Sequence, residues 1–139
     1  MSTESDCPFC GIVAGTIPST KVYEDDKTFA FMDIAPASDG HLLVVPKAHA
    51  KNLLEIPAED LAAVAQTGQR LAQRIMATLD ADGVNLINSC GEAAWQTVFH
   101  FHLHVIPRYA GRDGLTLPWV PTPGDADAIA ATGARLASD

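Results

Sequence analysis

The sequence predicts a single α+β domain, on three observations. The chain has 139 residues, which is the length of one domain. It contains five short segments with the composition of strands and one long segment with the period of an amphipathic helix. Its 47% hydrophobic and 19% charged residues are typical of a folded globular protein and not of a disordered one. We expect the domain to span residues 1–139, with residues 117–139 as its tail.

Five segments have the pattern of β-strands. The unbroken apolar run at residues 41–46 indicates a strand buried on both faces, and Pro46 ends it. Turn-forming residues at 25–27 and 35–40 separate the neighbouring segments. The predicted strands are residues 21–24, 28–33, 41–46, 84–88 and 98–106.

One long helix is expected between the third and fourth strands. From Pro57 to Leu79, apolar residues recur every three or four positions, which predicts an amphipathic helix of about six turns. Glu59 and Asp60 suit the positive end of its dipole, and the turn-forming residues 80–83 end it. The alanine-rich residues 125–136 predict a second, short helix.

The last predicted strand carries three histidines at alternate positions. A strand would place His100, His102 and His104 on one face, with same-face neighbours about 6.6 Å apart. Its other face would be apolar and would consist of Phe99, Phe101, Leu103 and Val105. Imidazole binds metals, carries protons and attacks phosphorus near neutral pH. The row therefore indicates either a catalytic metal site or a nucleophile directed at phosphorus.

Composition excludes some partners. The chain has 9 Lys and Arg against 17 Asp and Glu, a net charge of −8, which disfavours nucleic-acid polymers and anionic membrane surfaces. A small phosphorylated ligand held by local donors stays compatible with this charge. Because no apolar run approaches the roughly 20 residues of a membrane span and the first residues lack the pattern of a signal peptide, we expect a cytoplasmic protein.

Three cysteines are present, and two of them are close together in Cys7-Pro8-Phe9-Cys10. A redox pair of this kind normally follows a strand, and only six residues, five of them polar, precede Cys7. The same spacing can supply half of a four-ligand zinc site. The pair alone leaves both interpretations open.

The residues from His100 to Ile106 fit the pattern His-φ-His-φ-His-φ-φ, where φ is apolar. With this motif, the sequence resembles the zinc-bearing bacterial type of the histidine-triad (HIT) family of nucleotide-binding proteins and hydrolases. The resemblance covers nearly the whole chain. The other matching motifs are Cys-x-x-Cys at the start, Ile17-Pro18, Phe31-x-Asp33-Ile34, Gly40-His41-x-Leu-Val-Val-Pro-Lys47-x-His49, Gly91, Gln96-x-Val98 and Pro107-Arg108.

The resemblance implies a fold and an activity. The fold is an antiparallel sheet of about five strands with one long and one or two short flanking helices, and the sheet continues across a homodimer. The implied ligand is a purine nucleotide, AMP or GMP or a conjugate of one. The implied reaction cleaves a nucleoside phosphoramidate or related AMP conjugate at the α-phosphate through a nucleotidyl-histidine. The alternatives are a dinucleoside polyphosphate hydrolase, a nucleotide-binding regulatory protein with vestigial turnover, and a metal-dependent hydrolase.

The resemblance also assigns roles by position. His102 resembles the nucleophile, and His104 resembles the residue that hydrogen-bonds the phosphoryl oxygens. His41 resembles a neighbouring partner that fixes the nucleophile's tautomer, and Asp33 resembles the carboxylate that binds the ribose hydroxyls. The other implied nucleotide-binding residues are Phe9, Ile12, Phe31 and Ile34 around the base, and Ser89, Gln96, Thr97 and Val98 on the phosphate side.

For the cofactor, the resemblance implies one structural zinc ion, with no ligand position left for water. Its ligands would be Cys7, Cys10, His49 and His100. Two positions depart from the family pattern, because Ser89 stands where Asn is usual and Trp95 where a small Gly is usual. Both lie beside the expected phosphate pocket, so the resemblance leaves the leaving group open.

Overall fold

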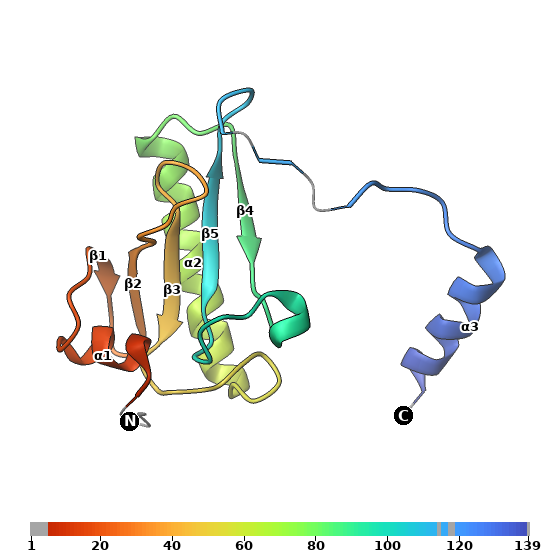
Figure 1. Cartoon of the computed structure of the whole chain (residues 1–139), viewed down its shortest axis with the longest axis horizontal. Helices are drawn as coiled ribbons and strands as arrows, with labels where there is room; N and C mark the ends of the chain where they lie inside the picture. Colours follow the sequence, from red (N-terminus) through yellow and green to blue (C-terminus); the bar gives the residue numbers. More distant parts are fainter. Residues whose placement is uncertain (1–5, 114, 117–118, 139) are drawn as a thin grey trace.

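The computed structural model describes residues 6–113, 115–116 and 119–138. Its centre is an open five-stranded sheet of order β1-β2-β3-β5-β4 in which every pair is antiparallel (Figure 1). The strands are β1 (Lys21–Glu24), β2 (Thr28–Met32), β3 (Leu42–Pro46), β4 (Gly83–Ile87) and β5 (Leu103–Arg108). The α+β prediction is therefore confirmed, and so are the first four strands to within a residue.

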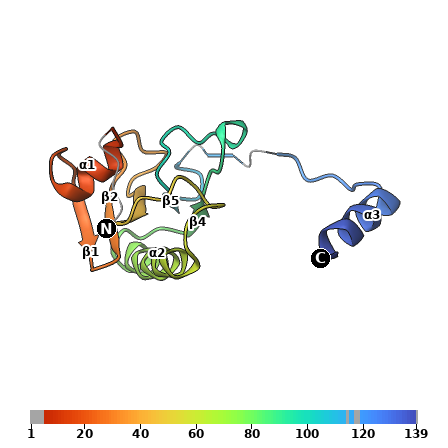
Figure 2. The same ribbon diagram turned by 90° about the horizontal axis from the view of Figure 1, so that it is seen from below.

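Two helices cover opposite faces of the sheet (Figure 2). The long helix α2 (Ala58–Thr78) packs on β2, β3, β4 and β5, close to its predicted bounds. Gly68 allows this close packing, since a Cβ there would lie 3.0 Å from a methyl carbon of Leu103. The short helix α1 (Pro8–Ala14) lies over the other face, beside β1 and β2.

β3 is buried on both faces, as its unbroken apolar run predicts. Leu42 and Val44 belong to the core under α2, whereas Leu43 and Val45 belong to a second core on the side of α1. The alternation of side chains along the strand separates the two cores. The second core also contains Phe9, Phe29 and Phe31.

The predicted strand at residues 98–106 is wrong in its bounds. β5 begins at Leu103 and runs two residues past Ile106, so only His104 of the three histidines lies in the sheet. The physical reason is that the preceding segment bonds to the loop after β3 instead, with the Phe101 amide donating to the Ala50 carbonyl at 2.7 Å. Phe99, expected on the apolar face, is 38% exposed.

Helix α1, which includes Cys10, is not among the elements that the sequence predicts. Pro8 at its first position and Gly15 at its end, with a φ of 84°, are the signals that mark it. A 3-10 turn, η1 (Glu92–Ala94), precedes the histidine segment. Helix α3 (Ala126–Ala137), which confirms the predicted short helix, lies apart from the sheet in both views. Within the described residues, no helix combines the length and apolar character that crossing a membrane requires.

Candidate active and metal-binding site

The five histidines lie in two neighbouring groups. The Cys/His cluster consists of Cys7, Cys10, His49 and His100. The His/Asp cluster consists of Asp33, His41, His104 and His102, whose ring lies edge-to-face with that of His104 at 5.1 Å between centroids. The sequence predicts one row of three imidazoles, whereas the structure divides them between two clusters, with His100 in the first and His102 and His104 in the second.

The Cys/His cluster has the dimensions of a tetrahedral metal site. His100 Nδ1 lies 3.4 Å from Cys7 Sγ, 3.5 Å from Cys10 Sγ and 3.2 Å from His49 Nδ1. Cys10 Sγ lies 3.4 Å from His49 Nδ1. Bonds of about 2.0–2.3 Å to a tetrahedral zinc ion place pairs of ligand atoms about 3.3–3.8 Å apart. These four residues therefore fit zinc in both chemistry and geometry.

The backbone prepares His100 to act as a metal ligand. Its Nε2 lies 2.9 Å from the Pro46 carbonyl oxygen, which can only accept, so Nε2 carries the proton. Nδ1 is then left with a lone pair facing the two thiols and His49. The ring is fully buried, and this burial lowers the pKa of His100 to about 4, which keeps it in the neutral form that binds metal.

His102 has the opposite arrangement of its ring nitrogens. Nδ1 lies 2.8 Å from the His100 carbonyl oxygen, so it carries the proton and Nε2 keeps the lone pair. Burial lowers the pKa of His102, although the His100 carbonyl and Asp33 oppose the shift. Phe9 lies edge-to-face against the ring at 5.1 Å. His102 is thus a neutral imidazole held in the tautomer that a nucleophile acting through Nε2 requires.

His41 lies against His104, not against the predicted nucleophile. The Ala37 amide donates to His41 Nδ1 at 2.9 Å, so the proton of the neutral ring is on Nε2. That Nε2 is 2.9 Å from His104 Nδ1, which must then accept, and this leaves the proton of His104 on its Nε2. The backbone amide of Ala37 therefore fixes the tautomers of both rings in turn. The tautomer of His102 is fixed by the His100 carbonyl instead.

Asp33 closes the His/Asp cluster. Its Oδ1 accepts from the Ala35 amide at 2.8 Å, and its Oδ2 lies 3.4 Å from His41 Nε2 and 4.0 Å from His104 Nδ1. Burial lowers the pKa of His41, and burial together with the two neighbouring histidines lowers that of His104 to about 4 despite Asp33. Because His41 Nε2 carries a proton, this cluster is less suited to bind a metal than the Cys/His cluster.

The residues expected around a base come together only in part. The rings of Phe9 and Phe31 meet edge-to-face at 5.4 Å, and Ile12 packs on the same core. Ile34 is 99% exposed and lies outside this group.

Of the four residues expected on the phosphate side, Gln96 has its side chain engaged in hydrogen bonds within the chain. The Gln96 amide accepts from the Gly91 amide at 2.8 Å and donates to the Lys51 and Val98 carbonyls at 2.9 and 3.1 Å. Ser89 is buried. Thr97 and Val98 line a hollow of about 740 Å³ that also borders Cys7 and His49.

One polar neighbour of His102 escaped the sequence analysis. Asn88 donates to the His102 carbonyl at 2.9 Å, and its buried Oδ1 has no hydrogen-bond partner within the described part of the chain. The available signal was an amide directly after the fourth predicted strand, one residue before Ser89. Trp95 has a φ of 74°, which explains why a glycine suits that position better.

Comparison with known proteins gives the family. The model of the HIT domain matches residues 14–111. The chain is 42% identical over 119 residues to "Protein hit" of Bacillus subtilis, which covers 86% of this chain and 82% of that protein. It is 33% identical over 133 residues to "Adenosine 5'-monophosphoramidase HNT1" of Candida albicans, or 93% and 88% of the two chains. The chain therefore belongs to the HIT family, and the resemblance stated above is confirmed.

Solved structures support the same conclusion. SMU.412c from Streptococcus mutans superposes with a TM-score of 0.91 and 40% identity, over 97% of this chain and 85% of that one. A zinc-bound histidine triad family protein from Mycobacterium smegmatis superposes with a TM-score of 0.77 and 44% identity, over 84% of each chain.

Proposed function

We propose that this protein hydrolyses a nucleoside phosphoramidate or a related AMP conjugate at the α-phosphate, through a nucleotidyl group on His102. The observation that carries the proposal is the pairing of His102 Nδ1 with the His100 carbonyl, which leaves Nε2 as the nucleophilic atom. The name of the C. albicans relative, a monophosphoramidase, supports this substrate class.

In the first step, His102 Nε2 forms a bond to the α-phosphorus while the bond from phosphorus to the leaving nitrogen breaks. That nitrogen, already protonated by solvent, leaves as the free amine. The positive charge that develops on His102 is stabilised by its Nδ1–H bond to the His100 carbonyl. The Nε2–H of His104 donates to a phosphoryl oxygen, where it stabilises negative charge without transferring its proton.

In the second step, a water oxygen attacks the phosphorus and releases one proton to solvent. The nitrogen–phosphorus bond breaks and its electron pair returns to His102 Nε2, which regenerates the neutral ring. The product is the nucleoside monophosphate.

The His/Asp cluster and its neighbours supply the groups for binding a purine nucleotide, AMP or GMP. Asp33 is oriented by the Ala35 amide and takes the ribose hydroxyls. Phe9, Phe31 and Ile12 offer apolar surface to the base. Asn88 Oδ1, buried beside His102, is free to accept a hydrogen bond from the ligand.

The proposal includes one structural zinc ion, which the Cys/His cluster would hold. When bound, zinc would tie α1 to the segment before β5, because its ligands come from both and from the loop after β3. The zinc-bound M. smegmatis relative supports this assignment. Metal analysis should give about one zinc per chain. We also propose a cytoplasmic location, where thiols stay reduced, and a homodimer whose sheet continues through β4, an edge strand.

The activity is tested with adenosine 5′-phosphoramidate and the full chain, by following the release of AMP. His102→Gly should reduce turnover about a thousandfold or more, and free imidazole should restore part of it, because imidazole can occupy the vacated space. Nucleotide binding and zinc content serve as controls for folding. Equal turnover by both proteins would contradict the role of His102. Nucleotide binding without turnover by the unmodified protein would favour the alternative of a binding protein.

A further inference from the structure

The loop between β2 and β3, here called the β2–β3 loop (residues 33–41), carries the main-chain amide that orients two histidines of the site. The Ala37 amide donates to His41 Nδ1 at 2.9 Å, and His41 Nε2 lies 2.9 Å from His104 Nδ1. Because a neutral imidazole has one protonated nitrogen, the bond between the two rings can run in either of two directions. In the first, His41 donates and His104 keeps a proton on its Nε2. In the second, His104 donates and its Nε2 has no proton left to offer a phosphoryl oxygen.

The Ala37 amide selects the first direction. In the second direction its N–H would face another N–H, on His41 Nδ1, and neither donor would have an acceptor. Asp33 Oδ2 also favours the first direction, but its 3.4 Å from His41 Nε2 is longer than an ordinary hydrogen bond. The position of Ala37 therefore decides whether His104 keeps its donor.

Ser38 binds the β2–β3 loop to the end of β5. The pairing of β3 with β5 ends at Leu42 and Val105, so the antiparallel course of the chain places the loop beside the last residues of β5. There the Ser38 hydroxyl donates to the Pro107 carbonyl at 2.6 Å. The Ser38 carbonyl in turn accepts from the His41 amide at 3.2 Å, which closes the turn that leads into β3.

Tyr109 binds the same loop through its hydroxyl. The hydroxyl donates to the Asp39 carbonyl at 2.7 Å, and the ring belongs to the core under α2. Gly40 packs closely on both neighbours, since a Cβ there would lie 3.0 Å from Pro107 Cγ and 2.5 Å from Leu79 Cδ1. The β2–β3 loop thus has no room to move toward β5, and two hydroxyl groups keep it from moving away.

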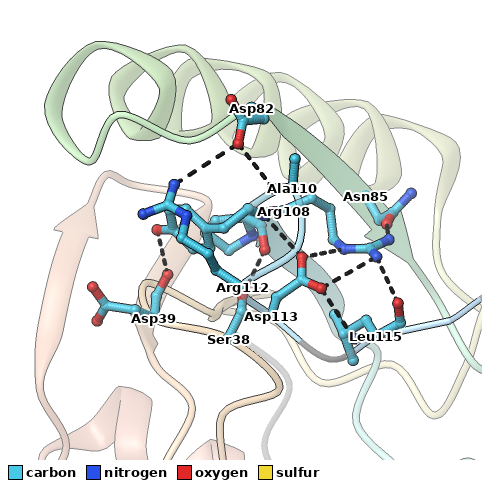
Figure 3. A network of polar contacts seen from close by, with 11 residues as sticks. Ser38, Asp39, Asp82, Asn85, Arg108, Ala110, Arg112, Asp113 and Leu115 are labelled. Carbon is cyan, nitrogen blue, oxygen red and sulfur yellow. Dashed lines mark hydrogen bonds and ion pairs between the residues drawn. The ribbon is translucent and has the colours of Figure 1, made fainter.

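A polar network holds Tyr109 in place (Figure 3). Asp113 Oδ2 accepts from the Tyr109 amide and from Arg108 Nε, both at 2.8 Å. Arg108 also donates to Asn85 Oδ1 on β4 at 2.7 Å. The Arg112 guanidinium lies over the Tyr109 ring, 5.1 Å from its centroid. The Tyr109 hydroxyl is therefore carried by a fixed part of the chain, which determines where the β2–β3 loop lies.

We propose that Ser38 and Tyr109 are positioning residues for the candidate active site. By holding the β2–β3 loop, they keep the Ala37 amide against His41 and so select the tautomer of His104. Both act through main-chain atoms of the loop and touch neither ring. The inference rests on the role proposed above for His104 in turnover, but the tautomers themselves can be measured without substrate.

The first test is the protonation of the ring nitrogens, measured on the full chain by long-range proton–nitrogen NMR correlations. In the unmodified protein, His41 and His104 should each show a protonated Nε2 and a bare Nδ1. The double variant Ser38→Ala/Tyr109→Phe should move both nitrogens of each ring toward intermediate chemical shifts, because both directions of the bond are then populated. A bare Nε2 on His104 in the unmodified protein would overturn the proposal.

Tyr23→Phe is the matched control. It also removes a buried-edge hydroxyl, which bonds to Asp25 and Arg70 at 3.0 Å each and not to the β2–β3 loop. This variant should retain the tautomers of the unmodified protein. A double variant that is folded by its thermal transition and shows the same tautomers as Tyr23→Phe would contradict the proposal.

Turnover of adenosine 5′-phosphoramidate gives the second test. Ser38→Ala should lower kcat about tenfold and leave KM within about twofold, because the donor to the phosphoryl oxygen is lost while the nucleotide-binding groups stay. Ser38→Thr keeps a hydroxyl and should recover most of kcat. Equal losses in the Ala and Thr variants would count against a role of the hydroxyl. Shifted tautomers in the double variant of a protein without turnover would support the positioning role and overturn only the proposed reaction.

Discussion

The Cys/His cluster and the His/Asp cluster use the same side chain in opposite ways, and the backbone makes the difference. In the Cys/His cluster, the Pro46 carbonyl accepts a hydrogen bond from the Nε2–H of His100, which leaves the unprotonated Nδ1 facing two thiols. In the His/Asp cluster, the Ala37 amide and the His100 carbonyl arrange the protons of three rings so that His102 keeps a lone pair and His104 keeps a donor. Neighbouring imidazoles thus differ in which ring nitrogen keeps its lone pair, because different backbone atoms bind their other nitrogens.

The largest difference between the two clusters is expected in the thermal stability of variants that lose one of their side chains. Cys10→Ser removes a ligand of the Cys/His cluster, so zinc should be lost and the Tm should fall by more than about 10 °C, because metal binding contributes directly to folding. His102→Gly should keep the zinc. The measurement is thermal unfolding together with metal analysis.

Cys90→Ser is the matched control, since Cys90 lies outside the cluster. It should retain zinc and change the Tm by a few degrees at most. Full zinc content in Cys10→Ser would contradict the ligand assignment.

A smaller effect, on turnover, is expected from His41. His41→Leu removes the donor that fixes His104 and should lower kcat about 100-fold, with zinc content unchanged. His41→Gln can present an amide N–H near the position of Nε2 and should recover part of the loss. The two variants are compared by steady-state kinetics on adenosine 5′-phosphoramidate. If Leu and Gln behave alike, His41 acts through packing and not through its proton.

The fold was largely predictable from the sequence, whereas this division of the histidines was not. The period of α2 and the apolar run of β3 are local patterns, and both predictions were confirmed. Side chains do alternate at this point, because Phe101 belongs to the core under α2 and His102 lies against Phe9 of α1. This alternation could not reveal that the segment bonds to Ala50 instead of joining the sheet. The groups that fix the tautomers are main-chain atoms, which every residue possesses, so no side-chain pattern marks them.

The pH profile tests the His/Asp cluster without mutation. Burial, and next to it His102 and His41, lower the pKa of His104 to about 4, while Asp33 opposes the shift. A folded pKa below the unfolded value of about 6.5 means that the stabilising contribution is complete above pH 6.5 and is lost as the pH falls toward 4. The free energy of unfolding, measured by chemical denaturation, should therefore fall as the pH is lowered from 6.5 toward 4, with zinc content measured at each pH. A free energy of unfolding that stays constant over this range would show that folding does not hold His104 neutral.

The smallest effect is expected from Trp95→Gly, which should leave both clusters intact. Trp95 has a φ of 74° and a side chain that is 74% exposed, so its backbone is strained and little packing would be lost. A non-glycine residue in this region costs about 1–2 kcal/mol, and the extra flexibility of unfolded glycine offsets part of the gain. Chemical denaturation should show stabilisation of about 0.5–1 kcal/mol. Asp80→Gly, at a φ of 58°, is the control and should gain less, because Asp tolerates this conformation better than Trp. The adjacent Gln96 donates to the carbonyls of Lys51, two residues after His49, and Val98, two residues before His100. A change in zinc content in Trp95→Gly would therefore mean that this loop also positions the Cys/His cluster.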